Sequence, residues 1–399
     1  MTARRLPVLI AGAGPVGLVA AAELVRRGIP VTVLEAEPAL PVELRASTFH
    51  APTLDMLDAL GAAKPMIAQG FVAPHLQYRN RDHSLIAALD FGVIADATRH
   101  PFRVQCEQFK LTRILAGLLE GRPGFALRFG AAVEGCADLG DRVRVTLAGG
   151  ETVEGSWLIG ADGAHSAVRR AMDIPFEGFT WPERFLVLST PHRFEDDIPG
   201  LADVTYYADP EEWFFLLRVP GPLWRAMFPV KPEVSEETVM SDAFAAARMA
   251  GILPGRRDGY AIRHRTLYRV HQRVAATFRK GRVLLAGDAA HINNPLGGMG
   301  LNGGVHDAVN LAGKLAQVVL DGADDALLDR YDRQRRGVTV EHVQAQTIAN
   351  KQNLEAATPE AQADFRRRMR EAAEDPAKGH ALLIRMSMIA SLRRAEEIA

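Results

Sequence analysis

Apolar residues near the N-terminus occur in the order that a strand, a helix and a second strand require. Residues 6–11 and 31–35 are short apolar runs, which are typical of buried strands. Between them, residues 16–27 have apolar positions at helical spacing, and Gly28 follows where a helix commonly ends. The pattern predicts a βαβ unit, which implies a parallel sheet with a right-handed crossover.

The strand-then-helix pattern returns twice later in the chain. The predicted pairs are residues 156–160 with 166–172 and residues 282–286 with 302–320. Between these pairs lie three runs rich in β-branched and aromatic residues, at 203–208, 213–219 and 223–230. The turn sequences DPEE and PGP separate these runs, which is typical of an antiparallel meander. The sequence therefore predicts a second sheet, inserted between parts of the first.

The predicted fold class is α/β, with a Rossmann-like dinucleotide-binding domain, an antiparallel-sheet substrate domain and a helical C-terminus. A chain of 399 residues exceeds the usual size of one domain. From residue 324 onward the sequence is helical and charged, which we interpret as a solvated helical face. The predicted ranges are 1–73, 101–180 and 270–325 for the dinucleotide domain, 74–100 and 181–269 for the substrate domain, and 326–399 for the C-terminal helices.

The charge balance argues against a polyanionic partner. The 47 basic residues nearly cancel the 48 acidic ones, so no overall field would draw the chain to nucleic acid.

The two cysteines, Cys106 and Cys136, have no metal-ligand spacing, and one pair cannot be a disulfide framework for a chain of this length. We therefore expect a cytoplasmic protein without bound metal.

Residues 6–25 form an apolar stretch with a single charged residue, Glu23, and a signal or membrane segment is one interpretation. Gly12, Gly14 and Pro15 interrupt this stretch where a spanning helix needs continuity. We therefore predict no membrane span.

The turn after the first predicted strand has a G-x-G-x-x-G pattern at Gly12, Gly14 and Gly17. In this position the three glycines allow a tight turn, close approach of a pyrophosphate and close helix packing, while the helix N-terminus supplies amide donors. Glu35 ends the second strand, where its carboxylate can accept hydrogen bonds from both hydroxyls of an adenosine ribose. These features predict a dinucleotide site without separating FAD from NAD, and an ordinary glycine-containing turn is the alternative.

Two further motifs occur where predicted strands end. Residues 157–166 lead from a strand through Asp162 to a short helix, and capping of that helix is an alternative role for Asp162. In residues 282–291 a buried strand places Asp288 at its C-terminal edge, where a carboxylate can bind a ribityl hydroxyl. The glycine-rich residues 295–302 then lead into a long helix whose N-terminal amides can face an electron-rich group. Both features suit a flavin.

The motifs GAGPVG (12–17), GADGAHSAVR (160–169) and GDAAHINNPLGGMGLN (287–302) together resemble those of the class A flavoprotein monooxygenases, the para-hydroxybenzoate hydroxylase-like aromatic hydroxylases. The resemblance covers about residues 6–345 and implies that the Rossmann-like domain binds FAD. Larger members of this family continue into a thioredoxin-like domain. This chain resembles the short form, which ends in helices.

The resemblance implies FAD contacts at particular positions of this chain. Arg45 matches an arginine that contacts the pyrophosphate, and Gln105 matches a position beside the adenosine diphosphate or ribityl part. We also expect that a β-carbon at Gly298 or Gly300 would clash or forbid the turn. The implied cofactor contacts are Gly12, Gly14, Pro15, Val16, Gly17, Glu35, Arg45, Gln105, Asp162, Gly287, Asp288, Pro295, Gly298, Gly300, Leu301 and Asn302.

The resemblance also implies the reaction. NADH or NADPH reduces FAD, dioxygen adds at flavin C4a, and the hydroperoxide passes one oxygen to an aromatic or phenol-like small molecule. No second G-x-G-x-x-G follows a strand, so the pyridine nucleotide would bind transiently. A homodimer is one form we expect. The alternatives are a flavin oxidoreductase or halogenase of related architecture, a nicotinamide-only dehydrogenase and a non-catalytic flavin-binding module.

Residues that contact the substrate are expected on the antiparallel meander, where ordinary sheet packing is the competing explanation for each aromatic side chain. Arg218 or Arg225 would suit a substrate carboxylate, although surface arginines are common on sheets. His291, which lies in the third motif, is expected to be a core histidine. The catalytic candidates are Tyr206, Arg218, Arg225 and His264, and the further side chains of interest are Tyr207, Trp213, Phe215 and Trp224.

Overall fold

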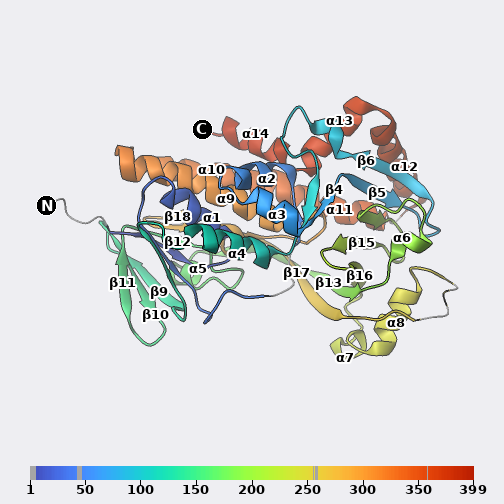
Figure 1. Ribbon diagram of the computed structural model, residues 1–399, viewed down its shortest axis with the longest axis horizontal. Coiled ribbons are helices and arrows are strands. Elements are labelled where there is room, and N and C mark those ends of the chain that lie inside the picture. Colours follow the sequence, from blue (N-terminus) through green and yellow to red (C-terminus); the bar gives the residue numbers. More distant parts are fainter. Residues whose placement is uncertain (1–5, 43–46, 255, 257–258, 357) are drawn as a thin grey trace.

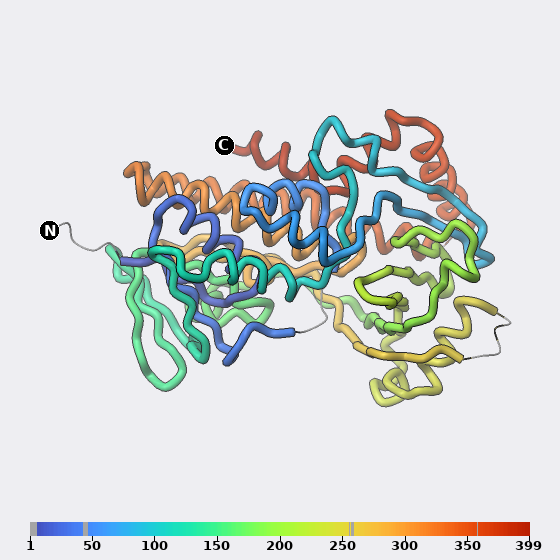
Figure 2. Tube along the Cα trace, in the orientation of Figure 1, coloured from blue at the N-terminus to red at the C-terminus, as the bar shows by residue number. Residues whose placement is uncertain are grey.

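The computed structural model describes residues 6–42, 47–254, 256, 259–356 and 358–399. Two sheet regions lie at opposite ends of the long axis of the molecule, and helices run along one side of both (Figure 1). The chain passes between these two ends several times, so that segments far apart in the sequence build each region (Figure 2).

A six-stranded sheet forms the first region. Its order is β18-β19-β12-β1-β2-β8, and neighbouring strands are parallel except for β18 with β19. Its strands are β1 (Val8–Ala11), β2 (Val31–Leu34), β8 (Phe125–Arg128), β12 (Trp157–Gly160), β18 (Arg279–Lys280) and β19 (Val283–Leu285). The prediction of a parallel Rossmann-like layer is confirmed.

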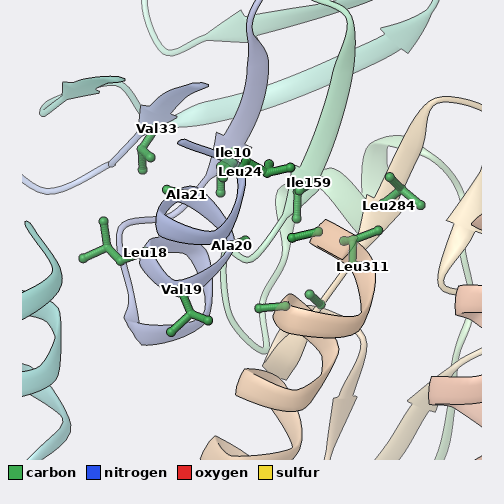
Figure 3. Close-up of a cluster of buried hydrophobic side chains, with 14 of the residues drawn as sticks. Ile10, Leu18, Val19, Ala20, Ala21, Leu24, Val33, Ile159, Leu284 and Leu311 are labelled. Carbon is green, nitrogen blue, oxygen red and sulfur yellow. The ribbon is translucent and has the colours of Figure 1, made fainter. Parts of the chain in front are cut away.

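Beside this sheet, α1 (Pro15–Val25) packs against both α4 (Gln108–Leu119) and α9 (Met299–Ala316). Figure 3 shows the interior of this region, where Leu18 and Ala20 lie on different sides of α1 and Ile10, Ile159 and Leu311 belong to the neighbouring elements β1, β12 and α9. All five side chains are fully buried, as the apolar runs of the sequence indicate.

Helix α9 begins at Met299, so the prediction that it starts at residue 302 is wrong. The glycine-rich sequence suggested a loop because glycine is a poor helix former. The helix persists because close packing offsets this low propensity. A β-carbon on Gly304 would lie 2.6 Å from Cγ2 of Val16 and 3.0 Å from Cα of Gly287, which shows how closely α9 approaches α1 and the turn after β19.

Two three-stranded antiparallel sheets, which the sequence analysis did not predict, accompany the parallel layer. The first consists of β9 (Val133–Asp138), β10 (Val143–Leu147) and β11 (Thr152–Gly155). The second has the order β3-β7-β4 and consists of β3 (Thr48–Phe49), β4 (Phe71–Ala73) and β7 (Arg103–Gln105). Strand β7 brings Gln105 opposite Thr48.

The second region is an eight-stranded sheet with the order β20-β17-β13-β16-β15-β14-β5-β6, antiparallel except between β14 and β5. The predicted meander is confirmed as β14 (Val204–Tyr207), β15 (Phe214–Val219) and β16 (Leu223–Val230). The other strands are β5 (His75–Arg79), β6 (Leu85–Asp90), β13 (Phe176–Thr190), β17 (His264–Ala275) and β20 (His291–Ile292).

The two faces of this sheet belong to different cores. The inner face packs with Leu296 and the C-terminal helices, and it is defined by Tyr78, Val187, Tyr206, Phe215 and Met227. The outer face packs with α7 (Glu236–Val239) and α8 (Asp242–Ala250), and it is defined by Leu186, Tyr207, Phe214, Leu216, Trp224 and Phe228. Alternation of side chains along each strand produces this separation.

Helices fill the remainder of the chain. Five follow α9: α10 (Leu327–Val338), α11 (Ala345–Glu355), α12 (Pro359–Glu374), α13 (Pro376–Met386) and α14 (Ile389–Glu397). The others are α2 (Ala51–Asp58), α3 (Ala63–Gln69), α5 (Ala167–Ala171), α6 (Phe194–Asp197), α7 (Glu236–Val239) and α8 (Asp242–Ala250), with a 3-10 turn at Phe91–Ile94. Within the described ranges, no helix is both long and apolar enough to cross a membrane.

Strands β13 and β17 run through the predicted domain boundaries at 180/181 and 269/270. The division of the chain into three domains therefore stays a prediction, while the α/β fold class with its two sheet types and C-terminal helices is confirmed.

Candidate functional site

The turn between β1 and α1 needs its first and third glycines for reasons within the protein. Gly12 has φ +97°, and a β-carbon there would lie 2.5 Å from the carbonyl oxygen of Ala161. A β-carbon on Gly17 would lie 2.1 Å from the carbonyl oxygen of Gly12. These two glycines therefore allow β1, β12 and α1 to meet at one point.

Gly14 differs from its two neighbours in the motif. Its φ is −68°, and no protein atom lies within 4 Å of the position of a β-carbon. Neither backbone conformation nor packing within the chain explains a glycine at this position. Gly14 begins α1, whose N-terminus has no side-chain cap and whose first helical residue is Pro15. Open space at an uncapped helix N-terminus fits a pyrophosphate.

Glu35 lies at the end of β2 and is 9% exposed. Its two carboxylate oxygens accept hydrogen bonds from the backbone amides of Ala13, at 2.6 Å, and Glu37, at 3.0 Å. These bonds hold the carboxylate beside the turn at Gly12, where the sequence predicted a ribose contact.

Asp162 takes part in capping the helix that follows it, the alternative that the sequence analysis left open, although the N-cap residue itself is Ser166. Its carboxylate accepts hydrogen bonds from Ser166 Oγ, at 2.5 Å, and from the backbone amide of Val168, at 3.1 Å. The cap orients α5 (Ala167–Ala171), and a contact of Asp162 with a nucleotide stays a prediction.

Asp288 follows β19 and its side chain is exposed, as a ligand-binding carboxylate at a strand end would be. The adjoining Gly287 is tightly enclosed, with φ +63° and a β-carbon position 2.9 Å from Cγ2 of Val16. Its amide donates to Asp307 Oδ2 at 3.1 Å. The turn that presents Asp288 is therefore anchored to both α1 and α9.

The loop of residues 293–298, which we call the 293–298 loop, ends in a left-handed residue that begins α9. Gly298 has φ +69°, and a β-carbon there would lie 3.0 Å from Cβ of Thr48, so the expected need for glycine is confirmed at this position. The same expectation is wrong for Gly300. Gly300 lies inside α9, where a β-carbon would lie 3.4 Å from Asn293 Oδ1 and meet no backbone atom.

The side chain of Asn302 ties the start of α9 to the segment before α2. Its Nδ2 donates to the carbonyl oxygens of Thr48 and Gly298, at 2.9 and 2.6 Å, and its Oδ1 accepts from the amide of His50 at 2.9 Å. With this side chain occupied, the backbone amides of Leu301 and its neighbours in the uncapped first turn of α9 are the groups that suit an electron-rich ring edge. Pro295, at the beginning of the loop, is exposed.

Gln105 is fully buried, and part of its amide lacks a partner. Its Oε1 accepts from Thr48 Oγ1 at 2.8 Å, whereas its Nε2 has no hydrogen-bond partner in the described structure. Buried donors are almost always satisfied in native proteins. Because Thr48 also touches Gly298, this free donor lies close to the 293–298 loop and fits a cofactor contact. Arg45, the remaining predicted contact, lies outside the described residues.

The structure places some candidates for substrate contact on the inner face of the eight-stranded sheet and others elsewhere. Tyr206 and Phe215 lie on the inner face, with ring centroids 5.4 Å apart. Arg225 and His264 both pair with Ser189, which places them in one row across the inner face. Arg225 is 7% exposed, and its Nη1 donates to Ser47 Oγ at 3.2 Å.

Other candidates pack against or pair with side chains of the protein itself. Arg218 forms an ion pair with Asp203 at 3.3 Å and lies over the ring of Phe71. Tyr207 and Trp224 point to the outer face, where Trp224 Nε1 donates to Glu195 at 2.8 Å. Trp213 packs edge-on against Phe185 in the core of the inner face. Ordinary packing or pairing therefore explains these four side chains.

Two histidines near the third motif are also structural. His291 Nε2 lies 2.7 Å from Asp307 Oδ2 within the protein core, which agrees with the expected core histidine. His306 Nε2 lies 3.0 Å from Thr53 Oγ1. Burial, together with the nearby charge of Arg335, lowers the pKa of His306 to about 3, so this imidazole is neutral near pH 7.

Three residues that the sequence analysis did not select lie beside this region: His50, Tyr78 and Arg103. His50 Nε2 lies 2.8 Å from the carbonyl oxygen of Gly297, in the 293–298 loop. Tyr78 stacks on Tyr206 with centroids 5.6 Å apart. Arg103 precedes Gln105 by two residues on β7. No local sequence pattern distinguishes these residues, because each depends on segments that meet only in the fold.

The inner face is covered slightly less completely than the outer face. Its side chains Tyr78, Val187, Tyr206, Phe215 and Met227 are 7% or 8% exposed, whereas Leu186, Tyr207, Phe214, Leu216 and Phe228 on the outer face are 0% or 1% exposed. A cavity of about 170 Å³ also adjoins Tyr78, with Asn350, Phe365, Arg368 and Arg385 among its lining residues. This cavity therefore lies between the inner face and the C-terminal helices.

Comparison with known proteins agrees with this geometry. A family model described as FAD binding domain matches residues 5–346. Para-nitrophenol 4-monooxygenase of Pseudomonas sp. (strain WBC-3) is 35% identical over 355 residues, with 86% of each chain covered. The 6-hydroxy-3-succinoylpyridine 3-monooxygenase HspB of Pseudomonas putida (strain DSM 28022 / S16) is 36% identical, with 87% of this chain and 88% of that protein covered.

Solved structures show the same relationship. The crystal structure of p-nitrophenol 4-monooxygenase PnpA from Pseudomonas putida DLL-E4 superposes with a TM-score of 0.90 at 31% identity, covering 98% of both chains. The chain belongs to the FAD-dependent aromatic hydroxylases, the class A flavoprotein monooxygenases. It is an FAD-binding monooxygenase that acts on aromatic compounds.

Proposed function

We propose that this enzyme uses NADH or NADPH and dioxygen to hydroxylate a small, single-ring phenol. Three of its relatives, two of which match this chain over more than 85% of both lengths, are named for p-nitrophenol, a hydroxypyridine and pentachlorophenol, which are single-ring compounds. The observation that carries the proposal is the apolar and aromatic inner face of the eight-stranded sheet, which packs with Leu296 of the 293–298 loop. A cytoplasmic location and a homodimer stay predictions from the sequence.

Each part of FAD would contact residues from a different segment of the chain. Gly14 and the N-terminus of α1 would receive the pyrophosphate, and Glu35 would accept the ribose hydroxyls at the end of β2. Asp288 would bind a ribityl hydroxyl. The uncapped first turn of α9 and Gln105 Nε2 would donate hydrogen bonds to the flavin ring. When bound, FAD supplies the redox and oxygen chemistry.

The protein's own contribution is to position the substrate and exclude water. The aromatic and aliphatic side chains of the inner face offer a flat apolar surface to a substrate ring. Covering elements, including Leu296 and the C-terminal helices, separate this surface from bulk solvent. A water-poor site strengthens the electrostatic interactions within it.

The test supplies purified protein with NADH or NADPH in air and a panel of single-ring phenols. We expect phenol-stimulated oxidation of at least one nucleotide and a product that has gained one oxygen atom by mass spectrometry. Nucleotide oxidation that no phenol stimulates, without an oxygenated product, would contradict the proposal.

The variant Asp288→Ala tests the cofactor assignment separately. Loss of a hydrogen bond to a buried ligand should weaken FAD binding by about 1–3 kcal/mol, measured by titration of the apoprotein with FAD. Asp321→Ala, which changes an exposed aspartate in the turn after α9, is the matched control and should bind FAD normally. Equal affinities for the two variants would place the ribityl contact elsewhere.

A further inference from the structure

Two cavities adjoin each other among the C-terminal helices. The larger, of about 250 Å³, is lined by the start of α9, by residues 341–349 and by the end of α13 and the start of α14. The smaller, of about 170 Å³, is the cavity that adjoins Tyr78. Gln346, Ala349 and Arg385 line both cavities, which therefore meet between α11 and α13. Each volume far exceeds the roughly 15 Å³ that one water molecule needs, so each can hold part of an organic molecule.

Irregular backbone surrounds the larger cavity. Thr339–Gln344 form a π-helix, and Glu341, His342 and Val343 of this segment line the cavity. Met388, another lining residue, has φ +66°, a conformation that is costly for any residue with a β-carbon. Short π-helical segments and left-handed residues other than glycine often occur at functional sites. Regular helix packing does not explain this cavity.

The smaller cavity leads to the inner face and to the 293–298 loop. Tyr78, on its lining, belongs to the inner face of the eight-stranded sheet. Asn350 also lines it and donates from Nδ2 to the carbonyl oxygen of Leu296 at 3.1 Å. Gln346, where the cavities meet, donates from Nε2 to Asn350 Oδ1 at 2.8 Å. A chain of hydrogen bonds thus runs from the junction of the cavities to the loop predicted to contact the flavin.

The rim of the larger cavity carries an uncompensated positive charge. Glu341, Ala345 and Arg385 are exposed, so the cavity opens to solvent. Glu341 forms an ion pair with Arg394 at 3.0 Å. Across the described ranges of the chain, the guanidinium of Arg385 forms no hydrogen bond and no ion pair. An unpaired cation at the mouth of a cavity attracts anions from solution.

We propose that the adjoining cavities are the route by which the substrate enters and the product leaves, and that Arg385 attracts anionic single-ring aromatic compounds to its mouth. The inference rests on the proposed function and adds the path to its site. A substrate passes Gln346 and Ala349 and reaches the inner face beside Tyr78. Because helices border this route on both sides, small shifts of α11 and α13 are enough to widen it.

Ala349→Trp tests the route, because it places a large side chain where the cavities meet. An obstruction on a path slows entry and exit alike and leaves the equilibrium affinity unchanged. The probe is 4-nitrophenol, mixed with the FAD-loaded enzyme in a stopped-flow spectrometer. We expect its association and dissociation rate constants to fall together by about tenfold, with a Kd that changes less than about twofold. Ala363→Trp, at an exposed alanine of α12 that lines neither cavity, is the matched control.

A chemical obstruction, introduced after folding, separates a blocked route from a misfolded protein. Ala349→Cys should bind 4-nitrophenol at the wild-type rates until N-ethylmaleimide alkylates the new thiol, and both rate constants should then fall. Wild-type enzyme treated in the same way controls for Cys106 and Cys136.

Arg385→Glu tests the attraction of anions. At a pH at which 4-nitrophenol is ionised, its association should be about 3- to 10-fold slower at low salt, and the difference should shrink at high salt because ions screen the charge. Association of the uncharged 4-nitroanisole should not change. Arg122→Glu, which makes the same change of charge at an exposed arginine after α4, should behave as wild type.

Unchanged rate constants in both folded Ala349→Trp and alkylated Ala349→Cys would overturn the route. A changed Kd with an unchanged association rate would also overturn it, because the cavities would then be a binding site and not a path. Equal association rates for Arg385→Glu and Arg122→Glu would overturn the role of Arg385. In each case phenol-stimulated nucleotide oxidation by the wild-type enzyme would persist, so failure of this inference differs from failure of the proposed function.

Discussion

Two arginines in this protein are equally buried, at 1% exposure each, and have opposite surroundings. Arg335, on α10, donates from Nε to Asp307 Oδ1 at 2.7 Å, and the other oxygen of Asp307 lies 2.7 Å from His291 Nε2. Arg103, on β7, has no described carboxylate within ion-pair distance. Burial alone therefore does not reveal what a charged residue does.

The difference separates a buried charge that has a carboxylate partner from one without a described carboxylate partner. Burial by itself would raise the pKa of Asp307, but the charges of His291 and Arg335 outweigh it and hold that pKa well below its ordinary value. Asp307 also accepts a hydrogen bond from the amide of Gly287, so the ion pair joins α10, α9 and the turn after β19. Arg103 stabilises nothing comparable.

The largest effect is expected from Arg335→Met. Replacing Arg335 leaves the buried Asp307 carboxylate with His291 as its remaining side-chain partner. Breaking a buried ion pair typically costs about 3–5 kcal/mol. We expect the free energy of unfolding, measured by urea denaturation, to fall by about this amount. A loss below about 1 kcal/mol, the value typical of exposed ion pairs, would remove the distinction between the two arginines.

A pH titration tests the surroundings of Arg335, because burial, together with the charge of this arginine, lowers the pKa of His306. His306 has a pKa of about 3 when folded, against 6.5 when unfolded, so the unfolded state binds the extra proton between these values. Stability should therefore fall as the pH drops below 6.5, by up to about 1.4 kcal/mol per pH unit. His306→Gln should flatten this slope in unfolding free energies measured between about pH 6.5 and 4. His75→Gln, at an exposed histidine, should leave the slope unchanged.

Arg103→Met should not lower the free energy of unfolding, in contrast to the same substitution at Arg335. Replacing an unpaired buried charge by an apolar side chain of similar length removes a desolvation penalty, so stability should stay constant or rise by about 1–2 kcal/mol. Urea unfolding of Arg103→Met and Arg335→Met under identical conditions makes the comparison. Equal losses would show that Arg103 also supports the fold.

The smallest changes in stability are expected at the two glycines at the start of α9. Gly298→Ala forces a left-handed conformation and crowds Thr48, and should lower stability by about 1–2 kcal/mol. Gly300→Ala lies inside the helix without such a contact and should raise it by up to about 1 kcal/mol. Thermal unfolding of both variants measures the difference. A reversed order would mean that the loop tolerates a side chain at Gly298.

The sequence predicted the parallel layer and the meander because their strands are apolar and separated by clear turn sequences. The runs at 203–208 and 223–230 correspond to β14 and β16 within one residue at each end. Strands β13 and β17 were not predicted. The first nine residues of β13 are exposed or half-buried and mix aromatic with polar side chains, and its partner β17 lies far away in the chain, so no local periodicity marks either strand.

The site was predictable only where a motif determines the backbone. The turn at Gly12 and the loop at Gly298 require glycine, and their spacing shows this in the sequence. Arg103 was not predictable, because a buried unpaired arginine and an exposed one look alike in a sequence. Its surroundings depend on β7 meeting β14 and β5, which lie in separate parts of the chain.

The long pairing of β13 with β17 also has a mechanical consequence. The two strands remain hydrogen-bonded from Phe176 opposite Ala275 to Ser189 opposite His264, and their register shifts once, between Thr180 and Arg184. A hinge rotation between the two sheet regions would have to bend this ladder. Bending is easiest at the single irregular point. Substrate and product must therefore pass through movements of loops and helices around the eight-stranded sheet, while the frame that holds the sheets together stays rigid.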